Sequence, residues 1–356
     1  MPVLSRSNLL RRPLATIFVC SGLALGTLMP GVAAAQTDVV PALVPPLPAG
    51  MSDPTNAALL YARALRMIAP EDLRQIRDAQ SGAEDAPSAE RVAEILENAE
   101  GSLRAVVDAS RLERCDWGVQ YSKGPMALLD HAGPMRNLTH MMDAQTRALA
   151  ARGDRQGAAE HAAAIFRMAE HMTQDRIMIS SLVGASMSRV GANRVNEMLD
   201  AGQLDRTGAE LVLSSVKRLR DARDFRMVEA LTTEGWMASQ WMRAAYTGPR
   251  AGALLVAGIG WMVEDAANAL KGLELLDEAG LKPQFDGIER AYADLIKAWN
   301  ARGNDAALED VYAKVLNGEY GTLARAFVPN FSRSRAQTTE SNATLDALSK
   351  RLQQVK

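Results

Sequence analysis

Apolar residues recur every three or four positions along almost the whole chain after residue 53, with polar residues between them. This spacing is the period of an α-helix that turns one face toward a core. Alternating runs of β-branched and aromatic residues, which would indicate strands, are nearly absent. The pattern therefore predicts an all-α protein. The expected helices cover residues 126–151, 156–172, 175–200, 206–221, 223–246, 252–277, 286–301 and 304–317.

Several residues predict where helices begin, break and end. Asp53 followed by Pro54 indicates a helix start, because Asp caps free amides and Pro fits the first helical position. Residues 79–90 are predicted to be a loop, and the helix that follows is expected to break near Gly101. A kink or split is expected in the 126–151 helix at Gly133 and Pro134. A final amphipathic helix is predicted from Leu345, Leu348, Leu352 and Val355.

Residues 251–263 carry no charge over 13 positions. A run of that length is too short to span a bilayer. It predicts a central buried helix, and insertion of Trp261 into a membrane surface is the alternative.

Small residues favour a tight helical hairpin in the middle of the chain. The stretch "ALAARGDRQGAAEHAAAIFRMAEH" places alanines on both sides of a short polar turn at 152–154. It is similar to one tetratricopeptide-type unit, but no second clean copy follows at a period of about 34 residues. The expected fold is an irregular helical-hairpin array, TPR-like or solenoid-like in character.

The N-terminal 35 residues have the three regions of a signal peptide. Arginines precede an apolar run from Leu14 to Met29, and small residues follow near Ala35. We expect cleavage there and export to the periplasm or beyond the cell, with an uncleaved membrane anchor as the alternative. The predicted organisation is a signal peptide (1–35), a Pro-rich linker (36–52), a helical domain (53–330), and a C-terminal linker with an amphipathic helix (331–356).

The charge of the chain limits its possible partners, and its cysteine content limits its possible disulfides. Cleavage would remove three arginines and no acid, taking the net charge from −2 to −5. No basic stripe suits nucleic acid and no polybasic run suits anionic lipid. Of the two cysteines, Cys20 would leave with the signal peptide. Cys115 would then have no intrachain partner, so the fold is expected to form without a disulfide.

The stretch "CDWGVQYSKGPMALLDHAG", residues 115–133, is the densest cluster of chemically capable side chains. Cys115 could be a nucleophile with His131 as its base, although spacing alone does not pair them. In the structural interpretation, which we favour, Asp116 caps backbone amides, Trp117 fills a gap in the core and Cys115 is a small buried hydrophobe. Gly118 then permits the turn.

Further candidate chemistry is scattered through the helices. Antiparallel pairing about the 152–154 turn brings His131 and Asp130 near His171 and Asp175, which are metal-ligand residue types without a fixed-spacing motif. Ordinary polar residues at helix ends are the favoured interpretation. Glu234 lies on an apolar face, so it is expected either to pair with an arginine or to have a raised pKa. Methionines could hold Cu(I), or more simply fill the core: Met135, Met141, Met142, Met168, Met172, Met178 and Met187.

Several segments resemble a group of uncharacterised exported all-helical proteins of planctomycete-type bacteria. They are "NAALLYARAL", "CDWGVQYSKGPMALLDHAGPMRNL", "LVGASMSRVGANRV" and "FVPNFSRSRAQ". The resemblance implies export and a helical fold and supplies no catalytic residue or cofactor. We predict a non-catalytic exported scaffold that binds a protein or peptide between its hairpins. The alternative is a metal-binding protein or hydrolase with a site around Cys115, His131 and His171.

Overall fold

The computed structural model describes residues 55–263, 265–301 and 305–355. Within these ranges the chain is all-helical and has no β-strand, only an isolated bridge between Asn56 and Arg114. The first half contains α1 (Ala57–Met67), α2 (Pro70–Ser81), α3 (Ala89–Ser110), the 3₁₀ helix η1 (Tyr121–Met126), α4 (Ala132–Ala151), α5 (Arg155–Thr173), α6 (Met178–Asp200) and α7 (Arg206–Asp221).

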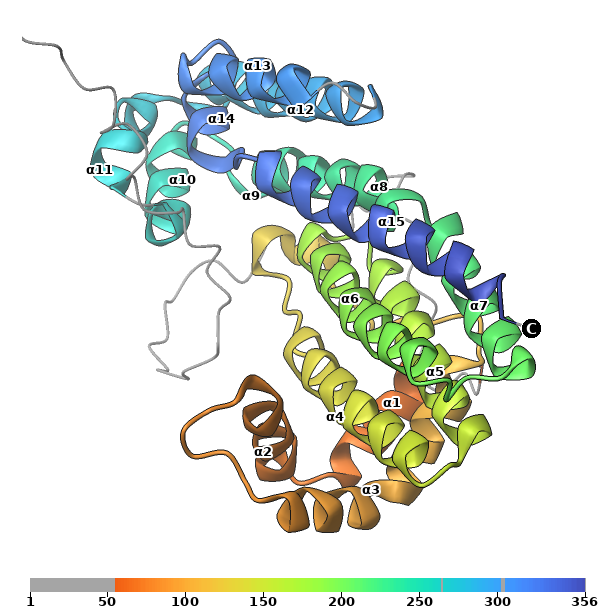
Figure 1. The fold of residues 1–356 in the computed structure, drawn as a ribbon. Coiled ribbons are helices and arrows are strands. Elements are labelled where there is room, and N and C mark those ends of the chain that lie inside the picture. Colours follow the sequence, from red (N-terminus) through yellow and green to blue (C-terminus); the bar gives the residue numbers. More distant parts are fainter. Residues whose placement is uncertain (1–54, 264, 302–304, 356) are drawn as a thin grey trace, which may run out of the picture.

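The second half contains shorter pieces and ends on a long helix (Figure 1). It contains α8 (Arg223–Trp236), the π-helical turn η2 (Met237–Trp241), α9 (Met242–Ala245), α10 (Ala251–Ile259), η3 (Gly260–Met262), α11 (Ala266–Ala269), η4 (Leu273–Leu275), α12 (Glu278–Asn300), α13 (Asp305–Leu316), α14 (Thr322–Phe327) and α15 (Ser332–Leu352).

The central helices agree with the periodicity. α5, α6 and α7 differ from the expected ranges by at most three residues, because their ends carry strong local signals. Asp154 accepts the N–H of Gly157 and Asp205 accepts that of Gly208, which satisfies amides that the first turn leaves unpaired. The predicted start at Asp53 lies outside the described residues. The first described helix, α1, begins at Ala57 with Asn56 as its cap.

Four helix predictions are wrong in their boundaries. The helix expected over 286–301 already begins at Glu278, where Asp277 caps the first turn of α12. α3 continues through Gly101 without a break, because one exposed glycine does not outweigh a regular apolar face. The helix expected over 126–151 begins only at Ala132, so Gly133 and Pro134 lie in its first turn. The helix expected over 252–277 is split into α10, η3, α11 and η4. This segment is not the central buried helix, since Leu254 and Trp261 are more than half exposed.

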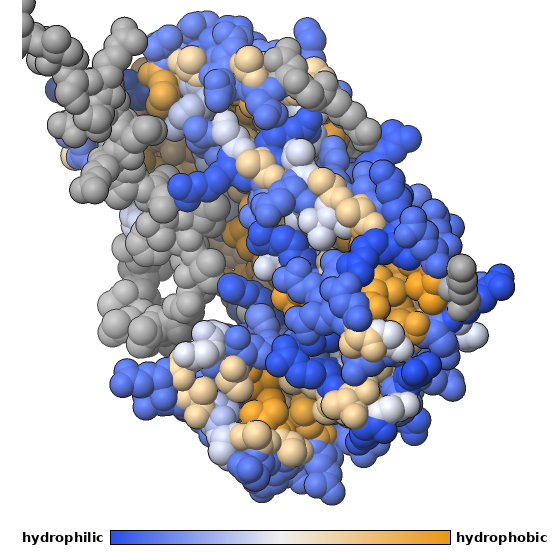
Figure 2. Space-filling view, in the orientation of Figure 1, coloured by the Kyte–Doolittle hydropathy of each residue, from blue (hydrophilic) through white to orange (hydrophobic). Residues whose placement is uncertain are grey.

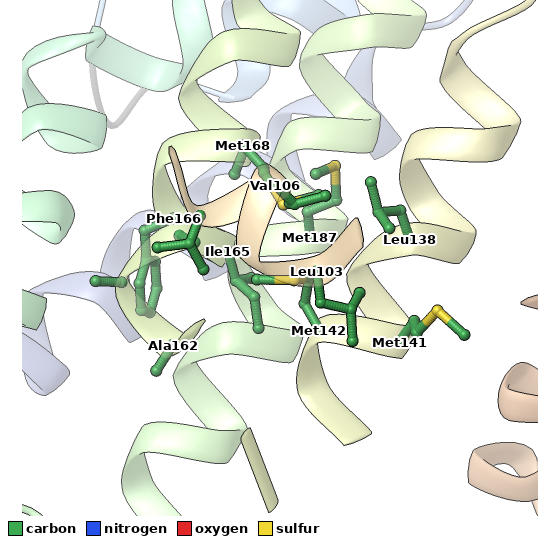
Figure 3. Packing of buried hydrophobic residues seen from close by; sticks show 14 of the residues in the cluster. Leu103, Val106, Leu138, Met141, Met142, Ala162, Ile165, Phe166, Met168 and Met187 are labelled. Carbon is green, nitrogen blue, oxygen red and sulfur yellow. The ribbon is translucent and has the colours of Figure 1, made fainter. Parts of the chain in front are cut away.

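The buried centre of the first half is α5, which contacts α3, α4, α6 and α7. Its alanines allow neighbouring backbones to approach closely, and α6 contributes two glycines to the same contact. A Cβ on Gly184 would lie 2.7 Å from the Ala169 carbonyl oxygen, and one on Gly191 would lie 3.0 Å from Ile165. Figure 3 shows methionines interleaved with Phe166 and neighbouring aliphatic side chains from these helices.

A second core gathers side chains of α8 through α14, with Phe285 and Trp299 among the largest buried residues. The last helix, α15, packs on α6, α7 and α8, as Figure 1 shows in dark blue. Its Leu345, Leu348 and Leu352 are buried in the first core. Within the described ranges no helix is both long enough and apolar enough to cross a membrane.

Candidate functional site

The connection between α3 and α4, residues 111–131, forms one wall of the candidate site, and we call it the elbow. Hydrogen bonds attach the elbow to the residue that precedes α1. Asn56 Nδ2 donates to the Asp116 carbonyl and Asn56 Oδ1 accepts the Asp116 N–H, each at 2.8 Å. Asp116 Oδ1 in turn accepts the N–H of Gly118, whose φ of +68° suits glycine. These contacts fix the elbow relative to the first helix.

The C-terminal end of α5 holds the elbow from the inside. His171 is fully buried, with Nε2 2.9 Å from the Leu112 carbonyl oxygen and Nδ1 2.9 Å from the Tyr61 hydroxyl. Because a carbonyl only accepts, Nε2 carries the proton and Nδ1 accepts from Tyr61. Burial lowers the pKa of His171 to about 4, so the ring is neutral at pH 7. Both nitrogens are occupied, which makes His171 a structural residue.

A second inner contact involves a buried carboxylate. Gln174 Oε1 accepts the N–H of Cys115 at 2.8 Å, while its Nε2 donates to Glu170. Glu170 is only 4% exposed and faces Arg218 at 3.3 Å and Arg226 at 3.7 Å. A buried carboxylate needs such partners, because an isolated one is costly to remove from water. The elbow is thus tied to α5 and through it to α7 and α8.

His131 and Asp175 meet where the elbow passes the end of α5. Nε2 of His131 lies 2.6 Å from Asp175 Oδ2, and both side chains are more than nine-tenths buried. The same carboxylate oxygen accepts the Ser180 hydroxyl at 2.6 Å. Since a carboxylate accepts from both, we assign the Nε2 proton to His131. Within the described ranges, His131 Nδ1 has no hydrogen-bond partner.

Four rings form a continuous row across the elbow. Trp117 stacks on His131 with ring centroids 4.6 Å apart, and on Tyr61 at 6.2 Å. Tyr61 in turn meets His171 edge to face at 5.8 Å. Trp117 is only partly buried, and its indole N–H interacts with the Cys115 thiol. It therefore packs within this row and also faces the surface, instead of filling a closed gap in the core.

Cys115 lies behind this row of rings and is 3% exposed. Burial raises the pKa of its thiol well above the ordinary range, and the carboxylates of Asp175 and Glu170 act in the same direction. A thiolate nucleophile needs the opposite environment. The arrangement gives Cys115 the properties of a small buried side chain.

The four metal-ligand candidates do not converge. His131 and Asp175 are paired, His171 bonds to Tyr61 and Leu112, and Asp130 is exposed. No group of three or more His, Cys, Asp or Glu side chains in the described part of the chain is placed to hold a metal ion. The seven methionines named above are all buried in the two cores, at 5% exposure or less.

Glu234 has the raised pKa that the sequence offered as its second alternative. Its Oε1 accepts the N–H of Met178 at 2.8 Å, at the first turn of α6. No arginine pairs with it in the described ranges. Burial raises its pKa to about 7, and this effect outweighs the backbone hydrogen bond, which lowers it. Glu234 thus caps a helix of the first half from a helix of the second.

An open groove of about 750 Å³ lies over the row of rings. Its walls come from the C-terminal end of α1, the start of α2, the elbow and the start of α4. The apolar lining residues are Ala62, Leu65, Ile68, Pro70, Leu73, Trp117, Leu128 and Pro134. Leu128 remains 62% exposed within this lining. An exposed leucine beside an apolar depression is typical of a binding surface.

Polar side chains edge this groove on several sides. Arg66 and Lys123 have no ion-pair partner among the described residues, and Asp130 and His131 also line the space. Sequence reasoning missed the roles of Leu128, Arg66 and Lys123. The only available signal was an apolar Leu128 within a Gly- and Pro-containing connection. Figure 2 shows a largely hydrophilic face on which hydrophobic side chains gather in a few patches, one of them beside α2.

These features define the class of the molecule as an all-α protein with an open, apolar-lined groove beside a buried His–Asp pair. Comparison with known proteins finds no family model, no curated protein and no solved structure that matches the chain. The resemblance to exported proteins of planctomycete-type bacteria stays a prediction.

Proposed function

We propose that this protein is an exported helical scaffold that binds an apolar segment of a protein or peptide partner in the groove. The observation that carries the proposal is the exposed Leu128 beside Trp117 on an apolar lining. Burying one such leucine against a partner contributes about 1.5 to 3 kcal/mol. An open groove with an exposed apolar rim suits a chain segment better than a small molecule, which is usually enclosed.

Two further features support the proposal. The consecutive helices α4, α5 and α6 contact one another, and helical hairpins are the unit from which TPR-like scaffolds build their binding surfaces. The sequence of residues 1–35 supports export, and a tagged full-length chain should mature to a product about 35 residues shorter outside the cytoplasm. An exported product that retains residues 1–35 would contradict cleavage.

Selection of peptides from a random display library on the purified protein tests the binding function. We expect enriched peptides to share apolar residues, because the groove lining is apolar. Leu128→Asp should abolish their binding, since it places a charge in the groove. Leu275→Asp is the matched control, because Leu275 is 83% exposed in η4 and does not line the groove. Failure to enrich any peptide, or equal binding by Leu128→Asp, would overturn the proposal.

The His131–Asp175 pair favours a second candidate, a hydrolase in which His131 activates a water molecule. A buried carboxylate that orients an imidazole is a common arrangement for a general base. The Ser180 hydroxyl donates to Asp175 and the Cys115 thiol is buried, so neither is arranged as a nucleophile activated by His131. Turnover of generic ester or peptide substrates that disappears in His131→Ala would support this candidate against pure binding.

A further inference from the structure

A second depression also lies against α2 and α4, and its lining is charged instead of apolar. This cleft, of about 410 Å³, is formed by α2, α4 and α6. Four arginines line it, Arg77, Arg136, Arg147 and Arg194, against two carboxylates, Asp143 and Glu197. The positive excess contrasts with the chain as a whole, whose net charge is −2.

The two carboxylates share one arginine within the protein. Asp143 accepts from Arg194 Nε at 2.7 Å and Nη2 at 3.1 Å, and from Gln80 at 2.8 Å. Arg194 also pairs with Glu197. Asp143 is buried in this network, whereas Glu197 is 61% exposed, and Arg77 already pairs with Asp78, so the excess positive charge of the cleft comes from Arg136 and Arg147. The cleft therefore presents positive charge to whatever enters it.

Arg136 and Arg147 are the unpaired charges of this cleft. Both are exposed on α4, and neither has an ion-pair partner in the described part of the chain. Arg136, His140, Asp143 and Arg147 recur at helical spacing, so they form one stripe along α4. Arginine side chains recognise carboxylates through two parallel hydrogen bonds.

The groove and the cleft share α2 and α4. α4 contributes His131, Pro134 and Asn137 at or near its start to the groove, and the Arg136–Arg147 stripe to the cleft. α2 contributes residues to both in the same order. Pro134 to Arg147 spans about 20 Å of helix. An extended peptide covers that length with about six residues.

Resting on the proposed binding function, we infer that the partner segment joins apolar residues in the groove to acidic residues in the cleft. Aspartate or glutamate side chains would lie about three to six positions from the apolar anchor. Their carboxylates pair with Arg136 and Arg147, while the apolar residues pack beside Leu128 and Trp117. Charge sets the register and direction of the segment, and apolar contact supplies most of the affinity.

Matched fluorescent peptides test this inference. Each carries an apolar block selected on the groove and a tail of glutamate, glutamine or lysine. We expect the glutamate tail to bind about tenfold more tightly than the glutamine tail at low salt, because two exposed arginines each add a modest attraction. The difference should disappear at about 0.5 M salt, where such charges are screened. The lysine tail should bind least tightly.

Variants separate this inference from the proposed function. Arg136→Gln combined with Arg147→Gln should remove the preference for glutamate and retain binding of the glutamine-tailed peptide. Arg206→Gln is the control, since Arg206 is exposed on α7 and pairs with Glu210 away from the cleft. The parent protein could bind the glutamate and glutamine tails equally well, or the double variant could keep the preference for glutamate. Either result would overturn the inference that acidic residues occupy the cleft, and the proposed peptide binding would be unaffected. Tighter binding of a single-stranded oligonucleotide would also overturn that inference. If the parent protein bound none of the peptides, the proposed function itself would instead be rejected.

Discussion

The two halves of the molecule reach a packed core by different routes. In the first half, long amphipathic helices surround α5, and alanine and glycine allow close contact over whole helix lengths. In the second half, α8 to α14 are mostly short, and the glycines Gly248, Gly272, Gly318 and Gly321, all at positive φ, lie in the turns between them. Regular periodicity therefore predicts α5 to α7 of the first half, whereas specific tertiary contacts shape much of the second half.

The difference extends to the way polar groups are buried. The first half contains Glu170, His171, Asp175 and Arg194 at 5% exposure or less, each with partners on other segments. These contacts hold the elbow in place, and the elbow forms one wall of the groove. In the second half, Arg335 is the comparable case, donating to the Trp299 carbonyl at 2.9 Å. The candidate site lies in the half whose interior is more extensively cross-linked by polar contacts.

The largest expected effect tests the polar network of the first half. Arg194→Ala should destabilise the protein by about 3 to 5 kcal/mol, because it leaves the buried Asp143 carboxylate without its main partner. Chemical denaturation of the variant beside the parent measures the cost. Arg206→Ala, which breaks an exposed pair with Glu210, should cost less than about 1 kcal/mol. If both variants lost the same unfolding free energy, the buried network would contribute no more to stability than an exposed ion pair does.

The next effect tests the close contacts of the second half. A Cβ on Gly252 would lie 1.9 Å from the Leu273 carbonyl oxygen, and the Gly252 N–H donates to the Leu276 carbonyl at 2.9 Å. Gly252→Ala should therefore cost about 3 kcal/mol, because backbone cannot move aside as a side chain can. Hydrogen exchange should show the loosening in α10 and α12 while α4 to α6 stay protected. Protection lost evenly across both halves would indicate that they unfold as one unit.

Glu234 links the halves and predicts a pH dependence. Its pKa is raised to about 7, so the folded state holds the proton more tightly than the unfolded chain does. This contribution is fully present below the ordinary glutamate pKa and is lost as the pH rises through about 7. Between about pH 5 and pH 8, unfolding free energy should fall by about 1 to 3 kcal/mol from this group.

Glu234→Gln should remove that slope. Its amide oxygen can still accept the Met178 N–H, and it cannot ionise, so the variant should be the more stable protein at the alkaline end. Thermal melts across the pH range measure the difference. Glu229→Gln, on the exposed face of the same helix, controls for removing a carboxylate from α8. A parent and Glu234→Gln that melt in parallel at every pH would refute the assignment.

The smallest expected effect is a stabilisation in the first half. A Cβ on Gly101 would meet no atom within 4 Å, and α3 runs through this position with regular helical geometry. Gly101→Ala should raise the unfolding free energy by about 0.5 to 1 kcal/mol, because alanine loses less backbone entropy on folding. The same glycine-to-alanine change has the opposite sign at Gly252, which makes the pair a direct comparison of the halves. A destabilising Gly101→Ala would mean that α3 needs a break there after all.

The local structure of the central helices could be predicted from the sequence alone. Helix type and the short turn between α4 and α5 depend on contacts within a few residues, such as the bond from the Gly157 N–H to Asp154. That hairpin register also brought His131 toward Asp175, because a short turn fixes which residues of antiparallel neighbours face each other. These features need no knowledge of distant segments.

Only the tertiary structure decided the rest. The groove joins α1, α2, the elbow and α4, and His171 finds its partners at Tyr61 and Leu112, 110 and 59 positions away. The apolar run at 251–263 has no polar face to orient it, so the position of α10 is set by the close contact of Gly252 with the carbonyls of Leu273 and Leu276. Periodicity encodes which face of a helix is buried, whereas the neighbour that buries it is set by the packing of the whole chain.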